Sequence, residues 1–304
     1  MKVFVLGIDG LEARLVKRWN LKNIMQREWG THDVASVVGP EEKIYTPIIW
    51  ASFLLGDSAV RFGYTWKQIL DERMKVAYGP ILYPLYRFKI FLFGKRKLGL
   101  RKYMVKLGLY KRDRVRREIW RIERLPEHIK QKTLVKEAKN LGYRVWIKEF
   151  PSYNDKEVAE MRAYMSIHFF ETLDERLKYL EEVYSFSIKL LEEAIDEFDA
   201  YDLLLYYSPL IDFANHMLYR PGKLKLMVHL ASYYKRIDRL VEKVSEKIGD
   251  SALMVISDHG YDPMEHEHSG YGFWSSNIIL TKKPQSITDF KNIIMDLLKT
   301  DTAP

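Results

Sequence analysis

The stretch that decides the fold is Ala252-Leu-Met-Val-Ile-Ser-Asp-His-Gly-Tyr261, near the C-terminal end of a 304-residue chain. Its first six residues are apolar and β-branched, as in a strand that is covered on both faces within a parallel sheet. The strand ends at Asp258-His259-Gly260, where two potential metal ligands precede a turn residue. Ligands bind at the carboxyl ends of strands in open α/β sheets. Taken alone, the pattern is equally typical of a turn with an exposed histidine, so the rest of the chain must decide.

Strands and helices alternate along most of the chain. Further strands are predicted at residues 2–8, 143–148, 202–207 and near 277–280, with a polar, β-rich stretch at 31–38. Helices are predicted at residues 11–29, 47–55, 133–140, 155–198 (in one or more pieces), 223–248 and 287–298. This alternation predicts a single α/β domain over residues 1–304, with a mainly parallel sheet sandwiched by helices.

Composition excludes several kinds of site. The chain contains no cysteine, so disulfides, thiolate zinc sites and cysteine nucleophiles are excluded. No apolar run approaches the roughly 20 residues that a membrane-spanning helix needs. Because the first residues already form a predicted strand, we expect no signal peptide. A cytoplasmic location is expected, with peripheral attachment to a membrane as the alternative.

One segment carries the basic character of the chain. Residues 85–124 contain 15 Lys/Arg and three Asp/Glu, a net charge of +12, whereas the whole chain carries only +8. This segment belongs to an aromatic-rich stretch, residues 58–130, which breaks the alternating pattern and is predicted to be a cap inserted in the domain. Three interpretations stay open: a cap with a solvated basic face, a cap that binds an anionic substrate, or an interfacial segment at 81–124 on anionic lipid. No motif supports nucleic-acid binding.

Side chains with metal-binding chemistry follow the predicted strands or begin the predicted helices. These residues are Asp9, Thr46, Asp212, His216, Asp258, His259 and His268. The spacing of Asp212 and His216 puts both on one helical face, and His268 is favoured over its neighbour His266. Each residue alone has a simpler explanation, such as a turn for Asp9 or a helix N-cap for Thr46 before Pro47.

Together these residues indicate a metal centre. Three Asp and three His suit zinc or manganese, and six ligands are too many for one tetrahedral ion. Strand ends of a parallel sheet converge on one edge, so the residues could meet although they span the whole chain. Two metals beside an activated hydroxyl are the arrangement of phosphoryl-transfer sites.

At this point the chain resembles a known family, the alkaline phosphatase superfamily and, within it, the type I phosphodiesterase/nucleotide pyrophosphatase branch. The matching pieces are Val5-Leu-Gly-Ile-Asp-Gly10, Thr46-Pro-Ile-Ile-Trp-Ala-Ser52, Asp212-Phe-Ala-Asn-His216, Ser257-Asp-His-Gly260 and His268-Ser269 followed by Phe273-Trp274-Ser275. The resemblance implies an alkaline phosphatase-like fold and two bound divalent ions, usually zinc. It implies one ion held by Asp9, Thr46, Asp258 and His259, another held by Asp212, His216 and His268, and Thr46 as the nucleophile.

The chain also departs from this family pattern. Eukaryotic members place an asparagine after the nucleophile to bind the phosphoryl oxygen, but this chain has no Asn between Asn23 and Asn140. Stabilisation of the oxyanion would then fall to the Thr46 backbone N–H, to the metals, or to a cation such as Arg61. A threonine at the nucleophile position points away from sulfatases and towards diesterases.

The expected function is a two-metal phosphoesterase that cleaves a phosphodiester or pyrophosphate bond of an anionic small molecule through Thr46. A phosphomonoesterase or a phosphoglycerate-mutase-like phosphotransferase on the same site is the enzymatic alternative. The other alternative is a catalytically weak protein of the same fold that binds lipid or polyanions through its basic segment.

Overall fold

Six strands form one sheet in the order β2-β8-β5-β1-β4-β3. The computed structural model describes residues 1–39, 43–93, 107–168 and 170–300. The strands of this sheet are β1 (Val3–Ile8), β2 (Glu28–Asp33), β3 (Val145–Ile147), β4 (Leu203–Ser208), β5 (Ala252–Ile256) and β8 (Tyr271–Ser276). A small second sheet pairs β6 (Tyr261–Asp262) with β7 (Glu267–His268). β1 pairs in parallel with β4 and β5, β3 pairs in parallel with β4, and β8 runs antiparallel to β5 and β2.

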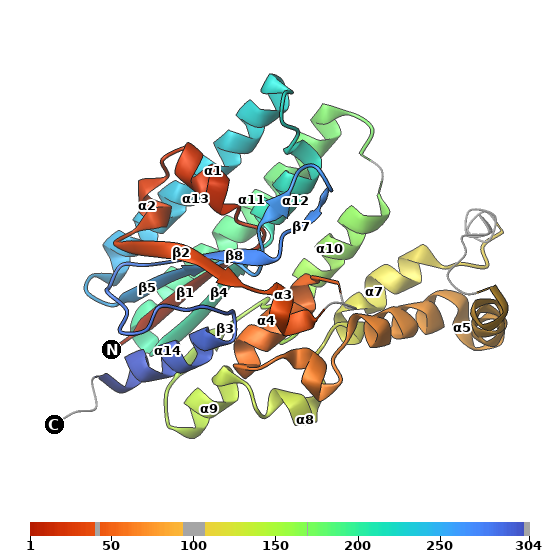
Figure 1. The fold of residues 1–304 in the computed structure, drawn as a ribbon, viewed down its shortest axis with the longest axis horizontal. Coiled ribbons are helices and arrows are strands. Elements are labelled where there is room, and N and C mark those ends of the chain that lie inside the picture. The colour runs from red at the N-terminus through yellow and green to blue at the C-terminus, as the bar shows by residue number, and fades with distance from the viewer. Residues whose placement is uncertain (40–42, 94–106, 169, 301–304) are drawn as a thin grey trace.

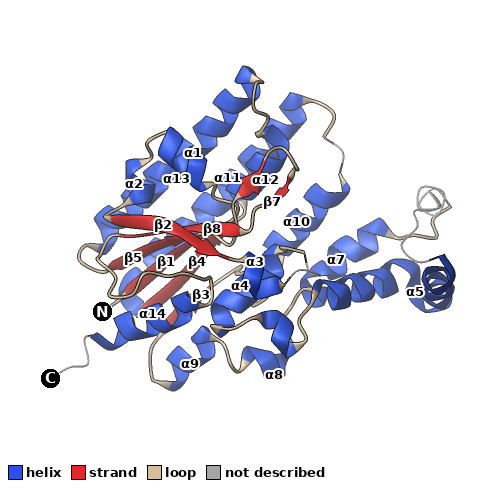
Figure 2. Ribbon diagram, in the orientation of Figure 1, coloured by secondary structure: helices blue, strands red, loops and turns tan. Residues whose placement is uncertain are grey.

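Helices cover both faces of this sheet (Figures 1 and 2). The helices are α1 (Ala13–Arg18), α2 (Lys22–Met25), α3 (Ala35–Val38), α4 (Thr46–Leu55), α5 (Trp66–Phe93), α7 (Arg112–Ile122), α8 (Glu127–Lys130), α9 (Leu134–Asn140), α10 (Glu157–Ile167), α11 (Leu173–Asp196), α12 (Leu210–Leu218), α13 (Leu224–Ile248) and α14 (Asp289–Lys299), with short 3-10 turns η1 (Ala59–Phe62) and η2 (Phe198–Ala200). One buried cluster joins the sheet to α1, α2, α11, α12 and α13. A second cluster joins the opposite face to α3, α4, α9 and α14.

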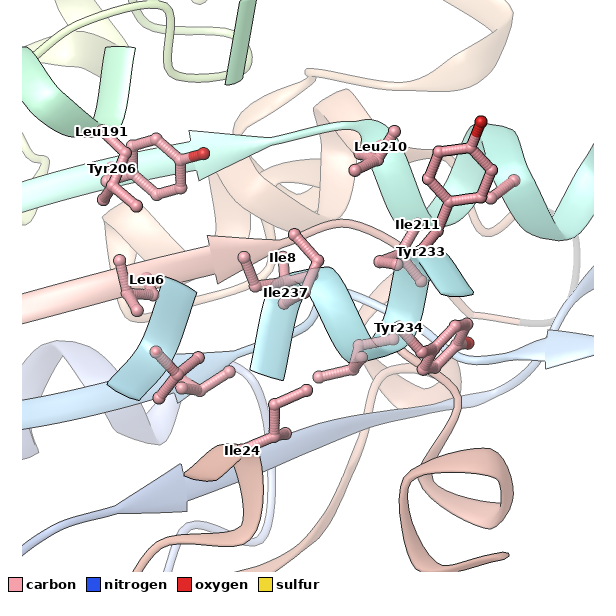
Figure 3. Close-up of a cluster of buried hydrophobic side chains, with 14 of the residues drawn as sticks. Leu6, Ile8, Ile24, Leu191, Tyr206, Leu210, Ile211, Tyr233, Tyr234 and Ile237 are labelled. Carbon is pink, nitrogen blue, oxygen red and sulfur yellow. The ribbon is translucent and has the colours of Figure 1, made fainter. Parts of the chain in front are cut away.

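The central strand β1 shows why the strands are apolar throughout. Successive side chains of a strand point to opposite faces, so Phe4 and Leu6 enter the first cluster while Val3 and Val5 enter the second. Figure 3 shows Leu6 in the first cluster, close to residues from α13. A strand that is buried on both faces has no polar face. The predicted α/β class, with a mainly parallel sheet sandwiched by helices, is therefore confirmed.

Two segments fold differently from the sequence-based expectation. Residues 11–29 are not one helix but α1, α2 and the start of β2, because Asn20 and Gln26 adopt positive φ angles of 50° and 51° that interrupt a helix. The strand expected near 277–280 lies earlier, at β8. Asn277 ends it by bonding through its side-chain amide to the backbone of Leu253 and Ser251. The helical region 155–198 is divided into α10 and α11, with η2 at its end.

Residues 58–130 include two long helices that lie to one side of the sheet, α5 and α7 (Figure 1). α5 is interrupted at Gly79, whose φ of 69° and ψ of 178° are not helical, and Pro80 begins the second half. α7 packs against both α5 and α10. The assignment of residues 1–304 to one domain with an inserted cap at 58–130 stays a prediction, and residues 94–106 lie outside the described chain. None of the described helices has the length and apolarity needed to cross a bilayer.

A buried carboxylate, Glu123, ties α7 to the core of the protein. Its Oε1 accepts hydrogen bonds from the Tyr45 hydroxyl and from Arg73 of α5, and its Oε2 accepts one from Arg162 Nη2 of α10 at 3.0 Å. Arg162 Nη2 also donates to Asp155 at 2.7 Å. Burial opposes the ionised form of Glu123, but Arg162 and Arg73 outweigh it and lower the pKa of Glu123 below its usual range. The chain segment that enters α4 is thus fixed by charges from three other elements.

Replacing this carboxylate should destabilise the whole protein. Glu123→Gln keeps the shape of the side chain but leaves Arg73 without its anion and Arg162 with Asp155 alone, which costs about 3 to 5 kcal/mol of unfolding free energy. Glu118→Gln, on the same helix, breaks a surface pair with Arg121 and should change the unfolding free energy by less than about 1 kcal/mol. Denaturant unfolding of both variants tests this. Equal effects of the two substitutions would contradict a structural role for Glu123.

Candidate functional site

The carboxyl ends of three adjacent parallel strands carry the candidate residues. Ile8 of β1 is in register with Ser208 of β4, and Gly7 is in register with Ile256 of β5. Asp9 follows β1 directly, Asp258 lies two residues past the end of β5, and α12 begins shortly after β4. The sheet therefore brings residues from both ends of the chain to one edge, as its parallel order requires.

The first group of side chains consists of Asp9, Asp258 and His259, all of them buried. His259 Nε2 lies 3.2 Å from Asp9 Oδ1 and 3.3 Å from Asp258 Oδ2. The Thr46 hydroxyl lies beside this group, 3.2 Å from His259 Nε2 and 3.4 Å from Asp9 Oδ1. The other Asp9 oxygen accepts a hydrogen bond from the hydroxyl of Tyr207.

The second group consists of Asp212, His216 and His268. Asp212 Oδ1 lies 3.3 Å from His216 Nε2 and 3.5 Å from His268 Nε2, and the two ring nitrogens are 3.1 Å apart. Asp212 and His216 share one face of α12, while His268 is supplied by β7. The neighbouring His266 is exposed and does not belong to either group.

The two groups touch each other. The His259 and His268 rings stack with centroids 3.7 Å apart and an interplanar angle of 11°. Gly10 lies between the carboxylates: its N–H donates to Asp258 at 3.3 Å, and an added Cβ would lie 2.8 Å from the Cα of Asp212. Its φ of 68° also favours glycine. Only a residue without a side chain allows β1 and α12 to approach this closely.

Backbone carbonyls orient two of the histidines. His259 Nδ1 faces the Gly260 carbonyl oxygen at 3.0 Å, and His268 Nδ1 faces the Ile44 carbonyl oxygen at the same distance. A carbonyl accepts a proton but donates none, so Nδ1 carries the hydrogen and Nε2 keeps a lone pair in the neutral ring. Both lone pairs point into the cluster. This is the arrangement in which a protein presents imidazole to a metal ion.

Burial and the neighbouring charges shift the pKa values of the first group. Burial, reinforced by the adjacent Asp9, raises the pKa of Asp258 well above its usual range. Burial disfavours a charged His259, but Asp258 and Asp9 outweigh burial and raise its pKa to about 10. This group of two carboxylates and one imidazole thus retains protons that a bound divalent cation would displace.

The second group combines an ionised carboxylate with a neutral ring. Burial acts to raise the pKa of Asp212, but His216 and His268 outweigh burial and lower it below its usual range. Burial, together with the nearby His259, lowers the pKa of His268 to about 3, so this imidazole is uncharged at neutral pH. A carboxylate and a neutral imidazole are both competent ligands.

The unsatisfied atoms of the cluster fit divalent cations. Asp212 Oδ1 and Asp258 Oδ2 are buried and have no hydrogen-bond partner among the described residues. Such orphaned acceptors are costly in a protein interior unless a cation or water satisfies them. The donor set is nitrogen and oxygen only, which suits zinc or manganese. Each group of three residues could hold one ion.

A cavity of about 680 Å³ opens beside the cluster. Its lining includes Thr46, Asp212, His216 and His268, and five cationic side chains: Lys43, Arg73, Arg162, Arg176 and Arg220. Apolar residues of α5, α7 and α10 form another part of the wall, among them Leu70, Met74, Val115, Ile119 and Ala163. The site can therefore receive an anionic group together with an apolar substituent.

Two local expectations change in the structure. Thr46 is the first residue of α4 and Tyr45 is its N-cap, so the Thr46 hydroxyl contacts Asp9 and His259 instead of capping the helix. Arg61, the expected substrate-binding cation, does not line the described cavity; its side chain is 76% exposed and pairs with Asp57 at 3.0 Å. The cations of the cavity come from elsewhere in the chain, and no local motif marked them.

Comparisons with known proteins extend these observations. The family model described as type I phosphodiesterase/nucleotide pyrophosphatase matches residues 104–290, which is more than half of the chain. No curated protein matches the chain in sequence. One similar solved structure is the PH0037 protein from Pyrococcus horikoshii, which is 13% identical over 98% of this chain and 97% of that chain, with a TM-score of 0.46. That likeness is too distant to carry an argument about fold or function.

The family match and the geometry of the sheet edge identify the same site. It covers five of the seven candidate residues, and the structure brings the other two, Asp9 and Thr46, against them. The fold agrees with an alkaline phosphatase-like sandwich. The chain therefore belongs to the type I phosphodiesterase/nucleotide pyrophosphatase family of the alkaline phosphatase superfamily, and it is a hydrolase of phosphoric ester or anhydride bonds.

Proposed function

We propose that this hydrolase cleaves a phosphodiester or pyrophosphate bond with Thr46 as its nucleophile and with two divalent cations, zinc in preference to manganese. The family is metal-dependent and acts on small anionic phosphoesters. The observation that carries the proposal is the position of the Thr46 hydroxyl, 3.2 Å from His259 Nε2 and 3.4 Å from Asp9, at the edge of the ligand cluster and in the wall of the cavity.

Thr46 has the local setting that a nucleophile needs. It begins the ten-residue helix α4, whose N-terminal dipole favours an anionic phosphoryl group beside the Thr46 N–H. The contacts with Asp9 and His259 limit rotation of its hydroxyl. When bound, divalent cations would lower the pKa of this hydroxyl and withdraw charge from the phosphoryl oxygens.

The proposed reaction has two displacements at phosphorus. The Thr46 hydroxyl gives up its proton to water, and its oxygen forms a bond to phosphorus while the bond to the leaving-group oxygen breaks. The leaving group departs with the bonding electrons as an anion. A water molecule then forms a new bond to phosphorus, the bond to Thr46 breaks, and the proton lost by that water restores the Thr46 hydroxyl. The side chains of Asp9 and His259 hold the same oxygen in place before and after turnover.

A buried ion-pair network supports the backbone next to Thr46. Tyr45 precedes the nucleophile and donates its hydroxyl proton to Glu123, which also binds Arg73 and Arg162. Both arginines line the cavity, so one buried carboxylate supports the backbone next to the proposed nucleophile and two cations in the cavity wall. We propose that these arginines bind the anionic substrate, as was expected of Arg61.

Removing the hydroxyl of Thr46 should remove turnover. Thr46→Ala is expected to lower kcat by about three orders of magnitude or more, because no other hydroxyl occupies its place, whereas Thr46→Ser should retain measurable turnover. Thr288→Ala, at the start of α14, serves as the matched control and should be fully active. Steady-state kinetics and an unfolding curve for each variant test this. Substantial activity in a well-folded Thr46→Ala variant would exclude Thr46 as the nucleophile.

Each ligand group should account for one ion. After native purification and dialysis, metal analysis is expected to find about two zinc or manganese ions per chain, and about one in either His259→Ala or His216→Ala. His266→Ala should retain both, because His266 lies outside the two groups. A wild-type protein without metal, or loss of both ions from His266→Ala, would contradict the two-group assignment.

The cavity favours a phosphorus that carries two substituents. Its wall includes apolar side chains of α5, α7 and α10 that can pack against a second substituent, so bis-(p-nitrophenyl) phosphate should be hydrolysed with a higher kcat/KM than p-nitrophenyl phosphate. The two compounds share a leaving group, so the ratio of their kcat/KM values reports the contribution of the second substituent. A preference for the monoester would favour a phosphomonoesterase or a mutase-like phosphotransferase at the same site.

A further inference from the structure

The second half of α5 presents a stripe of apolar side chains to solvent. Ile81, Leu85, Phe88 and Leu92 are all exposed and follow one another at intervals of four, three and four residues. This spacing puts all four on one face of the helix, because three to four residues complete a turn. Phe91, which is 83% exposed, lies at the edge of the same face. Soluble proteins rarely leave so many large apolar side chains together in water.

The opposite face of this helix is held in place. Tyr83 donates a hydrogen bond to Asp71 at 2.5 Å, Arg87 pairs with the same carboxylate at 2.8 Å, and Tyr86 stacks on Tyr78 with centroids 5.0 Å apart. These contacts bind the second half of α5 to its first half across the break at Gly79. The apolar stripe is therefore the outer side of an anchored helix, directed away from the rest of the protein.

Cations outnumber acidic residues in the segments next to the stripe. Residues 80–93 contain Arg87 and Lys89 and no acidic residue. The neighbouring α7 contributes the exposed cations Arg114, Arg116 and Arg117. α5 and α7 lie beside each other at the end of the molecule farthest from β2 (Figure 1). An apolar stripe flanked by cations is the pattern of a helix that lies in the interface of an anionic membrane.

We propose that residues 80–93 dock the protein on an anionic lipid surface, with the apolar stripe inserted at the level of the headgroups. A second copy of the chain fits this face less well, because its contact would bring the cations Arg87 and Lys89 of both copies together. A nucleic acid would satisfy the cations and leave the apolar stripe in water. Lipid satisfies both features, and this docking does not depend on which phosphoester the enzyme cleaves.

Sedimentation with lipid vesicles tests the proposal on the full-length chain. The protein should bind vesicles of phosphatidylcholine mixed with phosphatidylglycerol, bind vesicles of phosphatidylcholine alone much more weakly, and dissociate as salt is added. The double variant Leu85→Gln/Phe88→Gln should weaken binding by at least about tenfold, since each side chain buries apolar surface in the interface. Its unfolding curve and its hydrolysis of a soluble substrate should stay unchanged.

The matched control is Leu224→Gln/Val228→Gln, which replaces two exposed apolar side chains at the start of α13 and should bind vesicles like the wild type. Equal binding to both kinds of vesicle, no binding to either, or equal losses in the two double variants would overturn the proposal. Dimerisation in analytical ultracentrifugation that only Leu85→Gln/Phe88→Gln abolishes would assign the stripe to a second copy instead.

Discussion

The parallel pairing of β1 with β4 and β5 is the constraint on which the rest of the structure depends. Because the three strands share one direction, their carboxyl ends bring Asp9, Asp212 and Asp258 to one edge of the sheet. Burial, reinforced by repulsion from the neighbouring Asp9, raises the pKa of Asp258. The histidines balance part of this charge, and the orphaned oxygens of Asp212 and Asp258 leave the remainder to cations.

The surroundings of the cluster hold it in a fixed geometry. Gly10 lets β1 approach α12, and the carbonyls of Ile44 and Gly260 turn the ring nitrogens of two histidines inward. Farther out, Glu123 binds Tyr45 and two arginines that line the cavity. Removing one member of such a buried ion pair is costly, because the partner charge is left uncompensated away from water. The helices of residues 58–130 thus contribute to the site as well as to its surroundings.

Local sequence signals predicted most of this architecture. The strands at 2–8, 202–207 and 252–257 are buried on both faces, so their apolar runs were unmistakable, and the Asp and His residues after them marked the ligand edge. Residues 11–29 misled the prediction because two residues with positive φ break an apolar periodicity that otherwise suits a helix. The cations of the cavity could not be predicted: Arg73 and Arg162 meet Glu123 only through tertiary contacts. Arg61, which was suggested as a cation for the oxyanion in place of the missing asparagine, is exposed and pairs with Asp57.

The central claim is that one edge of the sheet holds two cations, one in each group of ligands. A crystal structure of the natively purified protein, with anomalous diffraction recorded at the absorption edge of the bound metal, measures this directly. The account predicts two anomalous peaks, one within coordination distance of Asp9, Asp258 and His259 and the other within reach of Asp212, His216 and His268. A single peak outside these groups, or no peak in a catalytically active crystal, would contradict it.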